Sequence, residues 1–219
     1  MKAALVPEVR FLDRSIDGRV RLLVLVATLL LAITYVVPLW NLTMFAPQYP
    51  DGLRLDIYSY MLAGGNGGQD VKEINVLNHY IGMHDLATES FTEFQWMPFV
   101  IGAIGLLLLR AIVHGTVGAL LDVTMVFVYF AAFSAWSFGY KLYQYGHQLA
   151  PDAAIKVAPF MPPMFGYRKI ANFEVYSYPR AGTYVMIGAI VLLALALAWT
   201  WQRARRATPG EAVAGGLSS

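Results

Sequence analysis

Residues 183–201 read TYVMIGAIVLLALALAWTW, an apolar run without a charged residue, and this run decides the class of the fold. A helix rises about 1.5 Å per residue, so roughly 20 apolar residues are needed to cross a hydrocarbon core of about 30 Å. Three further runs, at 22–39, 97–113 and 117–138, have a similar character. The chain is 58% hydrophobic and 14% charged, unlike a soluble domain. We therefore expect an all-α integral membrane protein with four transmembrane helices in a lipid bilayer.

The apolar runs set the expected boundaries along the chain. We expect transmembrane helices at 22–42, 96–114, 115–140 and 182–202, with loops at 43–95 and 141–181 between them. The segment 1–21 contains an expected interfacial helix over Val9 to Ile16, and the tail 203–219 is expected to be disordered. Tyr and Trp residues near the ends of the runs are typical of membrane interfaces.

The basic residues indicate which side of the membrane each segment occupies. The short segments are the N-terminal segment, the turn after the second span and the C-terminal tail. Their basic residues are Lys2, Arg10, Arg14, Arg19, Arg21, Arg110, Arg203, Arg205 and Arg206. Short segments rich in Lys and Arg stay in the cytoplasm. We therefore expect both termini on the cytoplasmic side of a bacterial inner membrane and both long loops in the periplasm.

The first loop carries a strand pattern. Leu53, Leu55 and Ile57 alternate with polar residues, which is the period of two that a half-buried strand shows. The glycine-rich segment 63–68 follows, and 71–77 is expected to return as a second strand. We therefore expect the two loops to form a small cap over the helices, with a β-hairpin whose tip is the glycine segment.

The cap also holds the candidate metal ligands. The chain has no cysteine, so a bound metal must use other donors. His79 and Met83 would share a face of a helix, and His84 follows directly. The second loop adds His147, just outside the third span, together with Met161 and Met164. Imidazole and thioether donors suit copper, especially Cu(I), while packing of ordinary polar loops explains the same residues without a metal.

Other functions find little support in the sequence. No Ser/His/Asp arrangement and no paired carboxylates stand out, so we do not expect an enzyme. The net charge of +2 and the lack of a basic patch interleaved with aromatic residues argue against a nucleic-acid partner.

Three motifs resemble one group of proteins. They are Leu77-Asn78-His79-Tyr80-Ile81-Gly82-Met83, the segment Tyr145-Gly146-His147 followed by Pro151 and Ala153 to Val157, and the opening Pro38-Leu39-Trp40 with Ala46 to Leu53. Together they resemble small polytopic membrane proteins encoded among the accessory genes of nitrous-oxide reductase. The resemblance implies a role in supplying copper to a periplasmic copper enzyme, with His79, Met83 and His147 contacting the metal. A metal-free structural subunit, docking a periplasmic partner or other membrane subunits, is the alternative.

Overall fold

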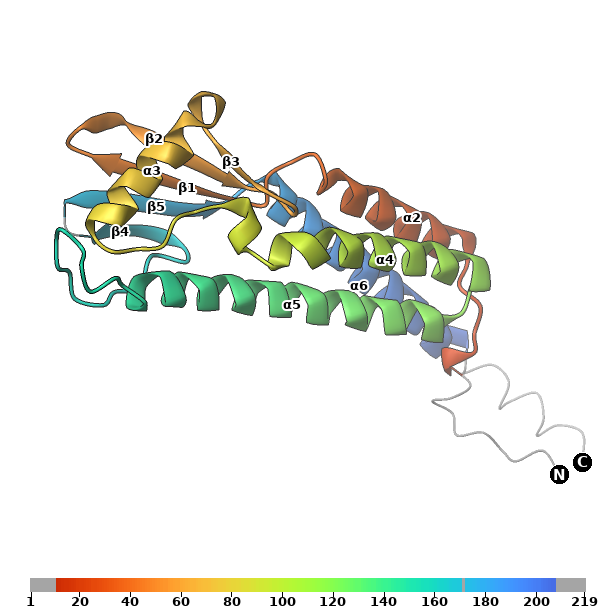
Figure 1. Ribbon diagram of the computed structural model, residues 1–219. Helices are drawn as coiled ribbons and strands as arrows, with labels where there is room; N and C mark the ends of the chain where they lie inside the picture. The colour runs from red at the N-terminus through yellow and green to blue at the C-terminus, as the bar shows by residue number, and fades with distance from the viewer. Residues whose placement is uncertain (1–10, 171, 208–219) are drawn as a thin grey trace, which may run out of the picture. The chain divides into compact units, whose positions relative to one another are not determined.

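The structure, a computed structural model, describes residues 11–170 and 172–207 (Figure 1). The chain forms two compact units. One is built from the chain up to Ala32, from 102–129 and from Ile187 onward, and the other from 33–101 and 130–186. The expected disordered tail at 203–219 lies mostly outside the described residues, and its first residues continue a helix to Ala207.

Among the described residues, three helices are long and apolar enough to cross a membrane. They are α4 (Glu93–His114), α5 (Val117–His147) and α6 (Ala181–Ala207). The prediction of a membrane protein is thereby confirmed for three of the four expected spans. Helix α2 (Gly18–Ile33) has 16 residues, about 24 Å, which is shorter than a hydrocarbon core of about 30 Å. The expected first span, 22–42, therefore ends too late, because Trp40 already belongs to a strand.

Each helix of the first unit buries one narrow stripe of side chains. Most buried positions recur at spacings of three or four residues: Val20, Val24, Ala27 and Leu31 on α2; Ile104, Leu108 and Ala111 on α4; Val117, Leu120, Val123, Thr124 and Phe127 on α5; and Ala189, Leu193 and Ala196 on α6. This is the spacing of knobs-into-holes packing between helices that cross at about 20°.

The segment before α2 is attached to the turn between α4 and α5. Ser15 forms a β-bridge with Thr116, the Ile16 amide donates to the Gly115 carbonyl at 2.7 Å, and Val117 donates to Arg14 at 3.0 Å. The interfacial helix expected over Val9 to Ile16 is therefore wrong at its C-terminal end. Its first two residues lie outside the described part of the chain.

The two long segments between the helices form one antiparallel sheet. Its strands are β1 (Trp40–Ala46), β2 (Tyr49–Ile57), β3 (Leu62–Gly64), β4 (Gly166–Ile170) and β5 (Phe173–Pro179), in the order β3-β2-β1-β5-β4. The pairing of β1 with β5 runs from Trp40↔Pro179 to Phe45↔Glu174. The all-α class is therefore not confirmed. The two expected loops share one five-stranded sheet, and this sheet with the helix packed on it is called the sheet domain below.

Helix α3 (Gln69–Tyr80) lies across one face of this sheet (Figure 1), after the short 3-10 helix η1 (Asn66–Gly68); a second, η2 (Thr88–Ser90), follows later. Ile74, Leu77 and Ile81 pack on Leu53 and Leu55 in one hydrophobic core. The strand in the predicted hairpin is β2, but the return strand expected at 71–77 is wrong, because this stretch is helical. The buried residues of this stretch recur at three- and four-residue spacing, which is the period of a helix. This period prevails over the strand propensity of the β-branched side chains.

A buried carboxylate fixes the glycine-rich turn before α3. Asp70 is 3% exposed, and its two oxygens accept from the Arg54 amide and from the Asn66 side chain, each at 2.8 Å. A charge at this depth is tolerated only when its acceptor capacity is used. The glycine segment is thus the connection between β3 and α3, held down by Asp70.

The start of α6 is closed by the segment before β1. Gly182 donates its amide to the Pro38 carbonyl at 2.9 Å, and Arg180 and Thr183 donate to Leu39. A Cβ on Gly182 would lie 2.9 Å from the Pro38 oxygen, so the close approach requires glycine. Helix N-termini leave amide groups without intrahelical partners, and here the chain itself supplies acceptors.

We expect Asp70→Ala to lower the free energy of unfolding of the sheet domain by about 1–3 kcal/mol, because the Arg54 amide and the Asn66 side chain both lose their acceptor. Asp51→Ala is the matched control, since Asp51 is an exposed carboxylate on the same sheet. Hydrogen exchange of the Arg54 amide in detergent-purified protein measures the effect. Equal protection in the two variants would contradict the role assigned to Asp70.

Candidate functional site

The C-terminus of α3 ends in a Schellman motif. The Met83 amide donates to the Asn78 carbonyl at 2.9 Å and the Gly82 amide to the His79 carbonyl at 3.2 Å, with Gly82 at φ +78°. The helix therefore stops before Met83. The expectation that His79 and Met83 share a helix face is wrong for this reason.

The segment after α5 docks on this helix end through its backbone. The Ala150 amide donates to the Gly82 carbonyl at 2.8 Å, and Ile155 donates to Tyr80 at 2.8 Å. A Cβ on Gly82 would lie 2.9 Å from both the nitrogen and the oxygen of Ala150. The glycine thus serves two purposes, the left-handed turn and the close contact.

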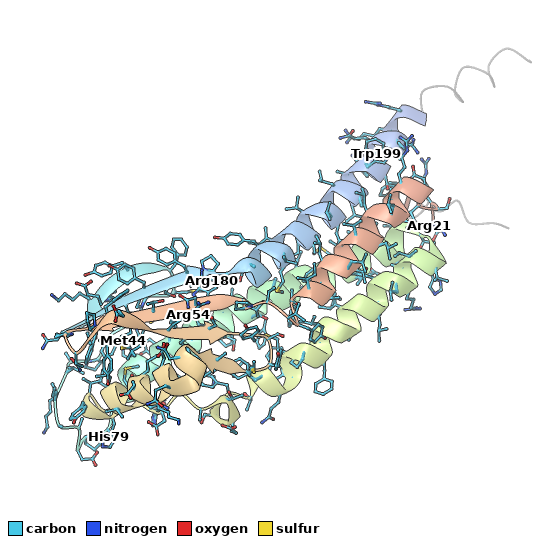
Figure 2. The ribbon with its side chains drawn as sticks, turned by 90° about the horizontal axis from the view of Figure 1, so that it is seen from above. Arg21, Met44, Arg54, His79, Arg180 and Trp199 are labelled. Carbon is cyan, nitrogen blue, oxygen red and sulfur yellow. The ribbon has the colours of Figure 1, made fainter. Side chains whose placement is uncertain are left out.

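A second glycine, Gly146, contacts the proline-rich stretch that follows. Phe160 donates its amide to the Gly146 carbonyl at 3.0 Å, and a Cβ on Gly146 would lie 2.9 Å from Pro162 Cδ. The segments that carry His79 and His84, His147, and Met161 are consequently joined by main-chain hydrogen bonds at one end of the sheet domain. Figure 2 shows His79 at the end of α3.

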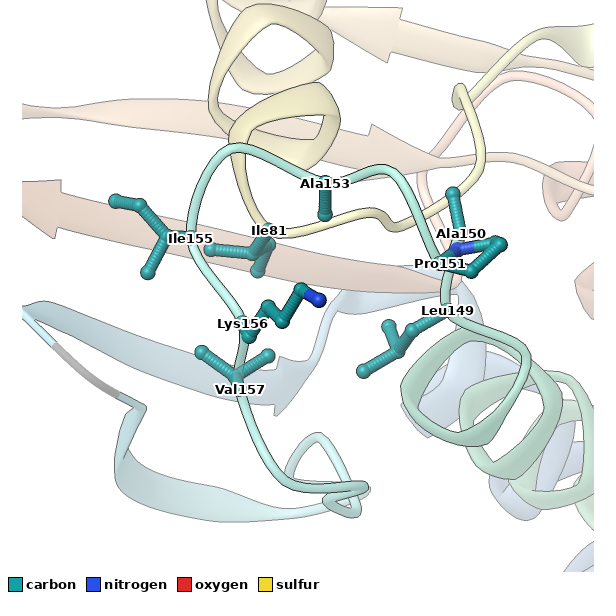
Figure 3. Close-up of a pocket in the computed structure, with 8 residues that line it drawn as sticks. All are labelled: Ile81, Leu149, Ala150, Pro151, Ala153, Ile155, Lys156 and Val157. Carbon is teal, nitrogen blue, oxygen red and sulfur yellow. The ribbon is translucent and has the colours of Figure 1, made fainter.

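A depression of about 290 Å³ lies where these segments meet (Figure 3). The residues that line it are Ile81, Leu149, Ala150, Pro151, Ala153, Ile155, Lys156 and Val157, and all of their side chains are apolar except that of Lys156. None of the predicted site residues lines this depression.

Two of the three histidines of this end are held by tyrosines of α5. The Nδ1 of His147 lies 2.9 Å from the Tyr143 carbonyl oxygen, and the two rings stack with centroids 3.9 Å apart. Since a carbonyl only accepts, Nδ1 carries the proton and Nε2 keeps its lone pair in the neutral ring. His84 packs edge-on to Tyr145, with ring centroids 6.2 Å apart, and His79 is exposed.

The methionines have three different surroundings. Met83 is half-buried and packs on the hydrophobic core of the sheet domain. Met161 is also half-buried, and its carbonyl accepts from Arg168. Met164 is 37% exposed, and its sulfur lies 3.5 Å from the position of a Cβ on Gly139, on the side of α5. Met83 is thus part of the packing, and Met164 is the most exposed of the three.

The chain segments of the predicted ligands meet, but the described residues contain no group of three or more His and carboxylate side chains placed to hold a metal ion. The sequence reasoning missed the apolar depression and the tyrosines that hold the histidines. The sequence signals for this convergence are Gly82 and Gly146. Gly82 lies between His79 and His84, and Gly146 lies directly before His147.

The chain matches no protein-family model, no curated protein and no solved structure. Any functional conclusion therefore depends on the geometry of the chain itself.

The outer surface of α3 carries one further polar contact. The Tyr49 hydroxyl and the Gln69 amide both donate to the Glu73 carboxylate, the latter at 2.7 Å. The hydrogen bond from Tyr49, followed by that from Gln69, lowers the pKa of Glu73 below its ordinary value. The same bond raises the pKa of Tyr49. This pair ties β2 to the first turns of the helix that carries His79.

We expect Gly82→Ala to destabilise the sheet domain more than Gly67→Ala does. Both glycines have positive φ, +78° and +65°, so each variant carries a left-handed strain of about 1–2 kcal/mol. Only at Gly82 would the new Cβ also meet the backbone of Ala150, since nothing lies within 4 Å of a Cβ on Gly67. Thermal unfolding and hydrogen exchange at the Ala150 and Ile155 amides measure the difference. Equal destabilisation would show that the segment of Ala150 moves away from the new Cβ without loss of stability, and would contradict this prediction.

We expect Tyr49→Phe to raise the pKa of Glu73 toward its ordinary value, because the largest cause of its depression is removed. A depressed carboxylate pKa contributes stability above the unfolded-state pKa, and this contribution is lost as pH falls through the folded-state pKa. The variant should therefore be less stable than the parent above the unfolded-state pKa, and this difference should disappear as pH falls below the folded-state pKa. An NMR titration of the Glu73 side chain tests this, with Tyr60→Phe as the exposed control. An unchanged pKa would contradict the assignment.

Proposed function

We propose that this protein is a membrane-anchored accessory protein that handles Cu(I) for the assembly of a periplasmic copper enzyme, such as nitrous-oxide reductase. The metal is cargo in this proposal, bound and released by His and Met residues of the sheet domain. The role requires no catalysis. Its physical requirements are a folded domain outside the membrane and donors that hold copper without trapping it.

The observation that carries the proposal is the backbone junction at Gly82 and Gly146. Through Ala150 and Phe160 it draws the segments bearing His79, His84, His147 and Met161 to one end of the domain. Donors from three segments distant in sequence would thus be available to one ion. A rigid main-chain junction also limits the entropy lost when the side chains close on a metal.

The tautomer of His147 favours ligation. With Nδ1–H donated to the Tyr143 carbonyl at 2.9 Å, Nε2 is the free donor atom of the neutral ring. Metal-bound histidines commonly donate their second nitrogen to such a carbonyl, which fixes the ring and strengthens the ligand. His147 is therefore our first ligand, and His79 or His84 and the thioether of Met161 are the candidates that complete a low-coordinate site.

The donor set predicts weak, exchangeable binding. Thioether and imidazole suit Cu(I), and the chain offers no thiolate to hold it tightly. Because no larger cluster of ligands forms among the described residues, copper would leave readily to a partner with more donors.

The proposal includes a topology. We infer that α2 and the turn at 34–37 together provide a fourth crossing, because β1 follows directly and belongs to the same sheet as the strand before α6. The clustered arginines support a cytoplasmic location for both termini. The sheet domain then faces the periplasm of a bacterial inner membrane, where the copper enzyme would be assembled.

A second candidate is a metal-free subunit that docks a periplasmic partner. The observation favouring it is a set of exposed rings on and beside β4 and β5. Phe165, Tyr167 and Tyr178 are 67%, 50% and 43% exposed, with Arg168 and Lys169 beside them. Aromatic residues and arginine are enriched in protein interfaces. This surface needs no metal to bind a partner.

We expect the purified protein to bind Cu(I) stoichiometrically and the double variant His79→Ala/His147→Ala to lose most of it. His114→Ala is the matched control, since it removes an exposed histidine at the end of α4. Metal analysis after loading and desalting gives the stoichiometry, and circular dichroism shows that each variant is folded. Background copper in the parent protein would contradict the copper proposal and favour the docking subunit.

A further inference from the structure

The described part of the first unit carries its charged side chains toward one end of its helices, where Figure 2 shows Arg21 and Trp199. It contains seven arginines and three aspartates, Asp13, Asp17 and Asp122, so the arginines are in excess by four. All seven arginines are exposed. They are named the basic end here and consist of Arg14, Arg19, Arg21, Arg110, Arg203, Arg205 and Arg206.

Segments that are distant in sequence meet at the basic end. The Arg14 carbonyl accepts from the first amide of α5 at 3.0 Å. A Cβ on Gly115 would overlap the Arg21 guanidinium, so this group lies directly against the turn between α4 and α5. Asp17, just before α2, pairs with Arg203 of α6. The arginines thus form one surface built from four parts of the chain.

The aspartates do not neutralise this surface. Asp17 uses both of its oxygens, because one accepts from the Val20 amide at 2.9 Å, which caps α2, and the other pairs with Arg203. Within the described part of the chain, Arg203 is the one arginine of the basic end that has a carboxylate within ion-pair distance. The other six guanidinium groups therefore keep donors for an anion that the described chain does not supply.

Exposed apolar side chains begin directly beside these arginines. Leu22, Leu25 and Leu29 are 61%, 40% and 59% exposed, and their spacing of three and four residues places them along one side of α2. Arg21 stands at the start of this row, one turn before Leu25. The surface therefore presents a guanidinium group and, next to it, a row of leucines. This pairing is complementary to a molecule with an anionic head and an apolar chain.

We propose that the basic end binds an anionic phospholipid, with its phosphate on Arg14 and Arg21 and an acyl chain along the exposed leucines of α2. Guanidinium groups donate parallel hydrogen bonds to phosphate oxygens. Helices α4 and α6, which end here, are long and apolar enough to cross a membrane, so lipid is at hand. A soluble phosphate would satisfy the arginines alone and would leave the leucines in contact with water.

The lipid site is independent of copper binding. Every candidate copper ligand belongs to the second unit, whereas the basic end belongs to the first. A protein that binds no copper can therefore still hold the lipid, and the failure of one proposal leaves the other unchanged.

Native mass spectrometry of the full chain tests the proposal, after release from detergent micelles that contain equal amounts of phosphatidylglycerol and phosphatidylcholine. We expect the protein to retain phosphatidylglycerol preferentially, because only this lipid has a net negative charge. Arg14→Gln/Arg21→Gln should weaken its retention by about fivefold for each arginine replaced. Arg168→Gln/Lys169→Gln is the matched control and should bind as the parent does, since it removes two exposed cations from β4 of the sheet domain.

A second measurement on the unmodified protein keeps the proposal falsifiable if a variant folds poorly. Glycerol phosphate carries a phosphate but no acyl chain, so an excess of it should leave the bound phosphatidylglycerol in place. Displacement by glycerol phosphate would assign the arginines to a soluble phosphate and overturn the lipid site. Equal retention of the two lipids by the parent would overturn it as well, as would equal loss of phosphatidylglycerol in the two double variants.

Discussion

The antiparallel pairing of β1 with β5 is the contact on which the sheet domain depends. It joins a strand that follows α2 to a strand that precedes α6, with every residue from Trp40 to Phe45 paired. Without it, β1–β2–β3 with α3 and the β4–β5 hairpin would be two separate small sheets, and the two-stranded hairpin would be too small to be stable alone. The same pairing brings Pro38 and Leu39 to the amide groups at the start of α6. One ladder of hydrogen bonds thus organises both the domain and the point where the chain enters the third long helix.

The sequence predicted the parts of the fold that composition alone controls. Apolar runs located α4, α5 and α6, and the alternation of Leu53, Leu55 and Ile57 located β2. It failed where a local pattern was ambiguous: Val71 and Ile74 favour a strand by propensity, yet burial at three- and four-residue spacing makes the stretch helical. The sheet could not be predicted, because Trp40 and Pro179 are paired across most of the chain and nothing local marks that partnership.

The residues of the candidate site stay a prediction, and their arrangement could not be derived from the sequence. His79, His84, His147 and Met161 were identified by their chemistry, and their segments do meet. What joins them is main chain against main chain at Gly82 and Gly146, a contact that side-chain chemistry does not report.

The distance in sequence between β1 and β5 has a consequence for biosynthesis. Ala46 and Phe173 are separated by about 130 residues, which a ribosome adds at roughly 5–20 residues per second. The strand β1 therefore waits roughly 6–26 seconds for its second neighbour while the later helices are made and inserted. During that interval its open edge is a template for pairing with any other extended chain. The rate of elongation, as well as the stability of the finished sheet, thus governs how many nascent chains reach the native pairing.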